Sequence, residues 1–131
     1  MKFRALPAKD WMDPFTGEYL YQEDTFVYGY LVRDNKGNPF IVGDVVEACE
    51  EYINFKFWVP VVDGTIGQYV TTFGKYEVYE GDLFQDEAGR EYTIRYDEEQ
   101  GAFIADEPED GWVGIDDVRH FEQRGNVFDG V

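Results

Sequence analysis

The chain has 131 residues, of which 44% are hydrophobic and 18% aromatic, and its formal net charge at pH 7 is -17. This apolar and aromatic content excludes a disordered chain, because such side chains bury too much area on folding to stay solvated. The length indicates one domain, and the negative charge argues against direct binding to nucleic acid or anionic membranes, both of which attract Lys and Arg.

Cysteine usage and the N-terminus bear on the compartment. Cys49 is the only cysteine, so no disulfide can form within the chain, which favours a reducing environment. The N-terminal segment has no apolar run of signal-peptide length, and no window comes near the roughly 18 apolar residues that a membrane-spanning helix needs. We expect a soluble protein of the cytoplasm, which would be that of the bacterial host if the family resemblance described below is correct.

The first half of the chain predicts a hairpin, followed by an ambiguous segment. Residues 25–33 are β-branched and aromatic, and a cluster of turn formers separates them from a second strand pattern at residues 39–42. Residues 44–52 are the best helical candidate, because Asp44 could cap them, although the segment is short and the alternative of no helix stays open.

Residues 52–62 predict a strand with one apolar face. Their apolar side chains recur at every second position, at Ile53, Phe55, Phe57 and Val59. Pro60 donates no ladder hydrogen bond, so we expect this strand at the edge of a sheet.

The second half of the chain alternates short strand patterns with turns rich in Gly, Asp and Glu. Strand patterns follow one another at residues 77–85, 91–97 and 102–106, and residues 112–128 contain two more apolar stretches. This spacing favours a small antiparallel barrel or sandwich. We therefore predict a mostly β single domain over residues 1–131, with an N-terminal β region over about 1–64 that includes the hairpin, a barrel-like region over about 65–131, and at most one short helix.

Glu80, Gly81 and Asp82 interrupt the first of these strand patterns. A glycine at such a place indicates a bulge or a sharp bend, and an acidic neighbour can accept the hydrogen bonds of a turn. A catalytic or metal-binding pair of carboxylates would need partner residues elsewhere, and the spacing supplies none. We interpret the three residues as a turn.

The negative charge is concentrated in the second half. Residues 1–75 contain 11 Asp and Glu against 7 Lys and Arg, whereas residues 76–131 contain 17 against 4. One interpretation is a surface that binds a basic partner, and the plainer one is charge that keeps the protein dispersed. The residues of such a partner-binding surface would be Asp97, Glu98, Glu99, Asp106, Glu107, Glu109 and Asp110.

Catalytic and metal-binding motifs are absent from the sequence. The chain has no serine, and His120 and Cys49 are the only histidine and cysteine, which excludes a serine hydrolase and an intrachain zinc site of the usual ligands. The acidic residues do not follow the spacing of a calcium-binding loop. We predict no catalytic residue, no cofactor and no metal site.

Five short segments resemble the YopX protein family of phages and prophages. They are KFRA (2–5), FVYGYLV (26–32), TIGQY (65–69), VYEGDLF (78–84) and RGNVFD (124–129), and they span nearly the whole chain. The resemblance implies a mostly β protein of phage or prophage origin, with the Glu-Gly-Asp turn leading into a small SH3-like barrel. It implies no activity. The family-motif residues, for which a structural role is expected, are Gly67, Gln68, Tyr69, Tyr79, Glu80, Gly81, Asp82, Gly125 and Asn126.

Two functional hypotheses follow from the sequence. The first is a non-enzymatic phage accessory protein that binds a host or phage protein, with a basic partner favoured by the charge. The alternative is a small domain that binds a ligand or a divalent metal, or a hydrolase, using clustered carboxylates. The aromatic excess also leaves a homo-oligomer open, since exposed edge strands pair readily.

Overall fold

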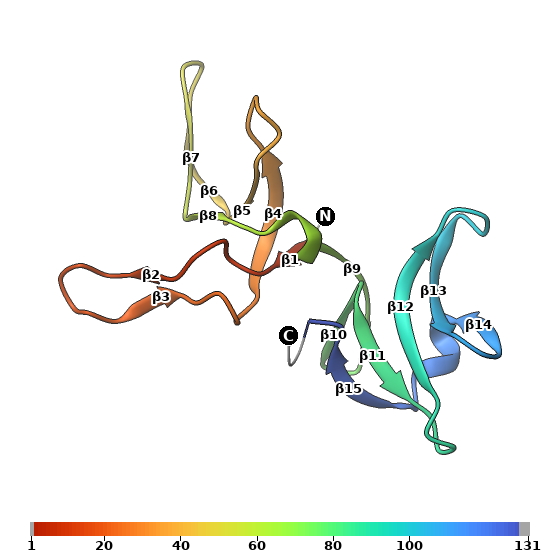
Figure 1. Ribbon diagram of the computed structural model, residues 1–131. Helices are drawn as coiled ribbons and strands as arrows, with labels where there is room; N and C mark the ends of the chain where they lie inside the picture. The colour runs from red at the N-terminus through yellow and green to blue at the C-terminus, as the bar shows by residue number, and fades with distance from the viewer. Residues whose placement is uncertain (1, 129–131) are drawn as a thin grey trace. The chain divides into compact units, whose positions relative to one another are not determined.

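The computed structural model describes residues 2–128, and the chain divides into two compact units, residues 1–68 and 69–131. Antiparallel strands are the main regular structure of both units (Figure 1). Within residues 2–128, helical structure is confined to two short 3-10 helices, η1 (Asp63–Thr65) and η2 (Ile115–Val118). The expected mostly β chain is therefore confirmed. No helix in this range is long and apolar enough to cross a membrane.

The first unit is built on one antiparallel sheet. Its strands are β1 (Phe3–Ala5), β4 (Val27–Arg33), β5 (Pro39–Val42), β8 (Trp58–Pro60) and the first two residues of β9 (Gly67–Phe73), in the order β9-β1-β4-β5-β8. The predicted hairpin is β4 and β5, and β8 is an edge strand, as Pro60 indicated. The core of this unit contains Ala5, Val27, Ile41, Val59 and Val61.

Gly29 allows β4 and β5 to approach each other closely. A Cβ atom at this position would lie 2.3 Å from the carbonyl oxygen of Val42 and 3.1 Å from the Cγ2 atom of Ile41. Neither strand has room for that atom while the antiparallel pairing of Tyr30 with Val42 is kept. The glycine in the middle of the first strand pattern therefore reflects backbone packing.

Two further pairs of strands leave this sheet as separate ribbons. One consists of β2 (Trp11–Met12) and β3 (Tyr19–Tyr21), the other of β6 (Val45–Ala48) and β7 (Ile53–Phe55). Residues 44–52, the best helical candidate, are not helical, and the alternative of no helix holds, because β6 and the turn after it occupy this segment. The single strand predicted over residues 52–62 is wrong. It is split into β7 and β8 at Lys56 and Phe57, where Lys56 donates its N–H to Asp44 (2.8 Å) and Phe57 accepts the N–H of Gly43 (3.1 Å).

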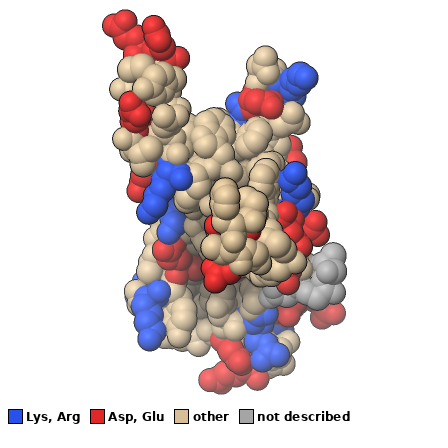
Figure 2. Space-filling model, turned by 90° about the vertical axis from the view of Figure 1, so that its left-hand side faces the viewer, with Lys and Arg blue, Asp and Glu red and all other residues tan. Residues whose placement is uncertain are grey.

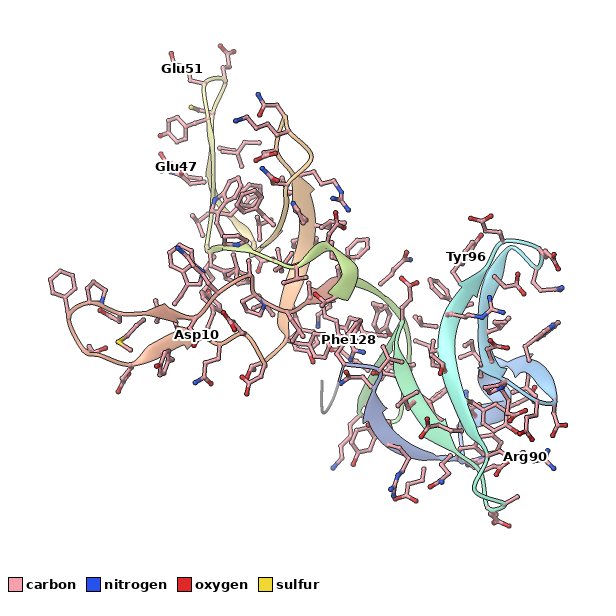
Figure 3. The ribbon with its side chains drawn as sticks, in the orientation of Figure 1. Asp10, Glu47, Glu51, Arg90, Tyr96 and Phe128 are labelled. Atoms are coloured by element: carbon pink, nitrogen blue, oxygen red, sulfur yellow. The ribbon has the colours of Figure 1, made fainter. Side chains whose placement is uncertain are left out.

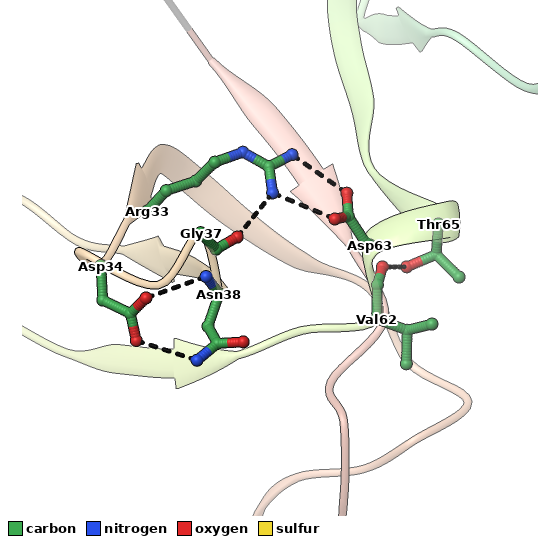
Figure 4. A network of polar contacts seen from close by, with 7 residues as sticks. All are labelled: Arg33, Asp34, Gly37, Asn38, Val62, Asp63 and Thr65. Carbon is green, nitrogen blue, oxygen red and sulfur yellow. Dashed lines mark hydrogen bonds and ion pairs between the residues drawn. The ribbon is translucent and has the colours of Figure 1, made fainter.

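Polar contacts fix the turn between β4 and β5. Asp34 accepts the backbone N–H and the side-chain amide of Asn38 at 2.9 and 3.1 Å (Figure 4). Arg33 donates two hydrogen bonds to the carboxylate of Asp63, each of 3.0 Å, and a third to the carbonyl oxygen of Gly37. The Asn38 N–H lowers the pKa of Asp34, and the Arg33 guanidinium lowers that of Asp63. Because Arg33 and Asp63 are exposed, their ion pair adds little stability.

The second unit combines a hairpin with a five-stranded sheet. The hairpin pairs Tyr69–Phe73 of β9 with β10 (Tyr76–Tyr79). The sheet has the order β14-β13-β12-β11-β15, with bounds Gly111–Gly114, Ala102–Glu107, Glu91–Asp97, Asp82–Gln85 and Glu122–Asn126. Hairpin and sheet share a core of Val78, Phe84, Tyr92, Ile94, Ala105 and Val118, against which Val70 and Phe73 pack.

The sheet of the second unit is open. Strands β14 and β15 form its two edges, so the predicted SH3-like barrel does not close. The sequence pattern specifies short antiparallel strands, but closure depends on whether the first and last strands meet, and local patterning does not determine that.

The Glu-Gly-Asp segment is the turn between β10 and β11. Gly81 has φ of +91°, a conformation that a Cβ atom disfavours, and its N–H donates to Ile94 at 2.8 Å. Asp82 is buried and accepts the N–H of Tyr79 at 2.8 Å. The interpretation of this segment as a turn is confirmed.

Candidate functional site

The ribbon of β2 and β3 forms arm 1, which we define as residues 10–24. Asp13 shapes its tip, since the carboxylate accepts the N–H of Phe15 at 2.8 Å and the backbone carbonyl accepts the N–H of Gly17 at 2.9 Å. Gly17 has φ of +74°, which suits glycine in a tight turn. This geometry presents Phe15 at the tip with 95% of its surface exposed.

The ribbon of β6 and β7 forms arm 2, which we define as residues 44–55. Across it, Val45 pairs with Phe55 and Ala48 with Ile53, so these four apolar residues share one face. Val45 and Ile53 are 54% and 53% exposed, because no second layer covers that face.

Polar groups of arm 2 lie on its other face and at its tip. The pair of Glu47 with Asn54 alternates with the apolar pairs, and the hydroxyl of Tyr52 donates to Glu47 at 2.7 Å. This hydrogen bond raises the pKa of Tyr52. Glu50 and Glu51 lie in the turn at the tip, and Figure 3 shows Glu47 and Glu51 along the ribbon.

Neither arm contributes a buried residue to the protein. All residues of both arms are exposed except Asp13, Tyr21 and Phe55, which are half-buried. A two-stranded ribbon is marginally stable in water, and large exposed apolar groups commonly mark interaction sites. The described residues include 17 exposed large apolar side chains, and nine of them lie on the arms: Trp11, Met12, Phe15, Tyr19, Leu20, Val45, Val46, Tyr52 and Ile53.

The arms also contain most of the negative charge of the first unit. Residues 1–68 include 11 Asp and Glu, and nine of these lie in residues 10–24 and 44–55, which contain no Lys or Arg. In Figure 2, acidic side chains gather at the outer end of a projection. The arms therefore combine exposed apolar groups with negative charge that no basic residue of the same segments neutralises.

The acidic residues predicted to form a partner-binding surface do not come together. Asp97, Glu98 and Glu99 lie at the turn before β13, whereas Asp106, Glu107, Glu109 and Asp110 lie at the other end of that strand. A strand of six residues places these two groups about 17 Å apart. The structure thus contains two separate acidic groups, and their role in binding stays a prediction.

Several of these acidic side chains already have partners within the second unit. Arg95 donates to the carboxylate of Asp106 at 3.0 Å. The guanidinium of Arg90, which is labelled in Figure 3, contacts the carboxylate of Asp110 at 2.6 Å. Glu107 is buried and accepts the N–H groups of Glu109 and Asp110. Part of the charge that the sequence placed on a surface therefore stabilises the turn between β13 and β14.

The family-motif residues are brought together from distant parts of the sequence. Tyr69 and Tyr79 are paired across β9 and β10, with ring centroids 5.7 Å apart, and Asp82 pairs with Asn126 across β11 and β15. Gly125 has φ of +86°. The remaining motif residues continue the same elements: Gly67 and Gln68 pair with β1, and Glu80 and Gly81 form the turn after Tyr79. These contacts involve backbone pairing and ring packing.

A cavity of about 510 Å³ lies in the second unit. It is lined mainly by Phe73, Tyr76, Val78, Phe84 and Phe121, with Glu77, Arg119 and Gln123 as polar members. The Arg119 guanidinium lies 5.6 Å from the centroid of the Phe73 ring, a cation-π contact. The sequence did not reveal this cavity, because β9, β10, β11, β15 and the segment after η2 all contribute to its walls.

Residues 2–128 contain no group of three or more His, Cys, Asp or Glu side chains arranged to hold a metal ion. Cys49 is exposed on arm 2, and His120 is exposed after η2.

No family model, curated protein or solved structure matches the chain. The resemblance to the YopX protein family therefore stays a prediction based on the five sequence segments.

Proposed function

We propose that this protein is a non-enzymatic protein-binding module and that the two arms are its binding surface. The observation that carries the proposal is the placement of nine exposed large apolar side chains on two ribbons that contribute nothing buried to the fold. Forming such ribbons costs conformational entropy without adding to a core, and covering them with a partner would remove their apolar surface from water.

The sequence resemblance implies a phage or prophage origin, and the partner would then be a host or phage protein. The proposal itself rests on the exposed apolar side chains of the arms and not on this origin. The arms differ from the surface expected from the sequence, because they lie in the first unit and combine apolar contacts with charge.

Affinity capture from a lysate of the bacterium that carries the gene tests the proposal. The tagged protein is compared with the double variant Val46→Thr/Ile53→Thr on arm 2 and with Phe15→Ser/Leu20→Ser on arm 1. Val127→Thr is the matched control, since Val127 is 42% exposed and lies outside the arms. We expect a partner that the native protein and the control recover and that at least one arm variant loses.

Circular dichroism should show all four proteins folded, because none of the substituted residues is buried. Equal recovery of the same partner by both arm variants and the native protein would refute the arms as the binding surface.

The alternative function is a small domain that binds a ligand or a divalent metal, or a hydrolase. The observation that favours this alternative is the aromatic cavity of the second unit. Its lining includes a single carboxylate, that of Glu77. A thermal shift on adding Mg²⁺, Ca²⁺ or a small aromatic ligand, lost in Phe121→Ala, would favour this alternative.

A further inference from the structure

We infer that arm 2 binds a basic segment of its partner, in which Lys or Arg residues accompany apolar side chains, and that it does not bind a second copy of this chain. This inference rests on the proposed function, and it adds the chemical class of the partner. It depends on the apolar face of the ribbon and on the charge that surrounds that face.

The apolar face supplies the contact area. Val45 and Ile53 lie on this face, with about half of each residue exposed. Ala48, the cross-strand partner of Ile53, is exposed as well. At the base of the arm, the Phe55 ring packs edge-on against Trp58, with centroids 5.1 Å apart, which anchors the ribbon to the sheet. A partner that covers this face therefore needs apolar side chains of its own.

The charge selects which apolar partner fits. Arm 2 carries Asp44, Glu47, Glu50 and Glu51 and no Lys or Arg. Two copies meeting through the apolar face would bring two ribbons of the same negative charge together, and like charges across an interface are unfavourable. A segment with Lys or Arg beside its apolar residues would instead place opposite charges next to the glutamates.

The glutamates at the tip are suited to this role. Glu47 accepts the hydroxyl of Tyr52, which holds that carboxylate against the ribbon. Glu50 and Glu51 lie in the exposed turn, where they can reach a partner beyond the edge of the apolar face. Attraction between exposed charges is screened within about 10 Å at 0.1 M salt, so binding should weaken as salt is added.

A selection from a random-peptide library against the full chain tests the inference. The selection is done at about 50 mM salt, and the enriched peptides are sequenced. The dissociation constant of one enriched peptide is then measured by fluorescence anisotropy for the native protein, Ile53→Thr and Glu50→Gln/Glu51→Gln. The control Glu87→Gln/Glu91→Gln also removes two charges, from exposed positions of the second unit.

We expect enriched peptides that combine Lys or Arg with apolar residues. Their binding should weaken about fivefold or more in Ile53→Thr and in Glu50→Gln/Glu51→Gln, remain unchanged in the control, and weaken again at about 300 mM salt.

Three outcomes would overturn the inference. The first is enrichment of neutral or acidic peptides whose binding Ile53→Thr abolishes, a result that leaves arm 2 a binding surface and removes only the basic partner. The second is self-association of the native protein in sedimentation that Ile53→Thr abolishes, since arm 2 would then bind a second copy. The third is a selection that enriches no peptide. Peptides that bind equally well to the native protein, to both arm 2 variants and to Phe15→Ser/Leu20→Ser on arm 1 would instead contradict the proposed function.

Discussion

Gly29→Ala should destabilise the first unit severely. The added Cβ would lie 2.3 Å from the carbonyl oxygen of Val42, and real Cβ atoms essentially never come closer than 3.0 Å to another heavy atom. Strands β4 and β5 must therefore separate by about 0.7 Å or lose their pairing at this point. Overpacking of this kind typically costs 1–3 kcal/mol, and we expect about 3 kcal/mol because the obstructing atom belongs to the backbone.

Urea unfolding followed by the fluorescence of Trp58 measures this change in the free energy of unfolding. Trp58 lies in β8, which pairs with β5, and replacing Trp11 and Trp112 by Phe makes it the only tryptophan. With a slope of about 1.5 kcal/mol per M, the midpoint should fall by about 2 M.

The matched control for this prediction is Gly64→Ala. A Cβ atom on Gly64 meets nothing within 4 Å, so the free energy of unfolding should stay within about 0.5 kcal/mol of the native value. If Gly29→Ala were as stable as this control, the close approach of β4 and β5 would be refuted.

Three further predictions concern the second unit. Gly81→Ala should cost about 1–2 kcal/mol in thermal or urea unfolding, because Gly81 has φ of +91°; an unchanged midpoint would contradict the turn geometry. Ile94→Ala should cost about 2–5 kcal/mol, since Ile94 is 1% exposed in the core, and a loss below 1 kcal/mol would show that Ile94 is not buried. The N–H of Arg90 and the hydroxyl of Tyr92 lower the pKa of Asp86. Its contribution to stability is therefore present above the unfolded pKa of about 3.9 and lost as pH falls through the lower folded pKa. The difference in unfolding midpoint between the native protein and Asp86→Asn should shrink from pH 6 to pH 2.5. A constant difference would show that the ionised Asp86 carboxylate does not stabilise the folded state.

The parts of the fold that were predictable have strong local signals. The turn between β4 and β5 follows from Asp34, Gly37 and Asn38, and the turn after β10 follows from Gly81. In each case the residue type needed for the backbone conformation or the turn hydrogen bonds stands at the turn itself. Such signals locate turns, and they do not depend on contacts with distant parts of the chain.

The errors occurred where distant contacts decide the structure. The segment of residues 44–52 is too short for its apolar pattern to distinguish a helix from a strand. It forms a strand because Val45 pairs with Phe55, which lies outside the segment. The break at Lys56 and Phe57 lies opposite Gly43 and Asp44, to which both residues are hydrogen-bonded although they are more than ten residues away. No pattern within either segment contains that information.

The proposed binding surface was missed for a related reason. Charge counted over halves of the sequence pointed to the second unit, where Arg90 and Arg95 contact part of it. Segments without Lys or Arg do include the arms, within residues 10–32 and 37–55, but residues 57–74, 76–89 and 96–118 lack them as well. That the arms form uncovered ribbons is visible only in the structure.

The absence of buried residues in the arms has an evolutionary consequence. Apart from Tyr21 and Phe55, which are half-buried and pack against the first unit, substitutions in residues 10–24 and 44–55 remove nothing from either core, so selection for folding places little constraint on them. The sheets and the arms can therefore change at different rates. A lineage can alter what the arms bind by point mutation while it inherits the same scaffold, which would allow this fold to follow a partner that is itself changing.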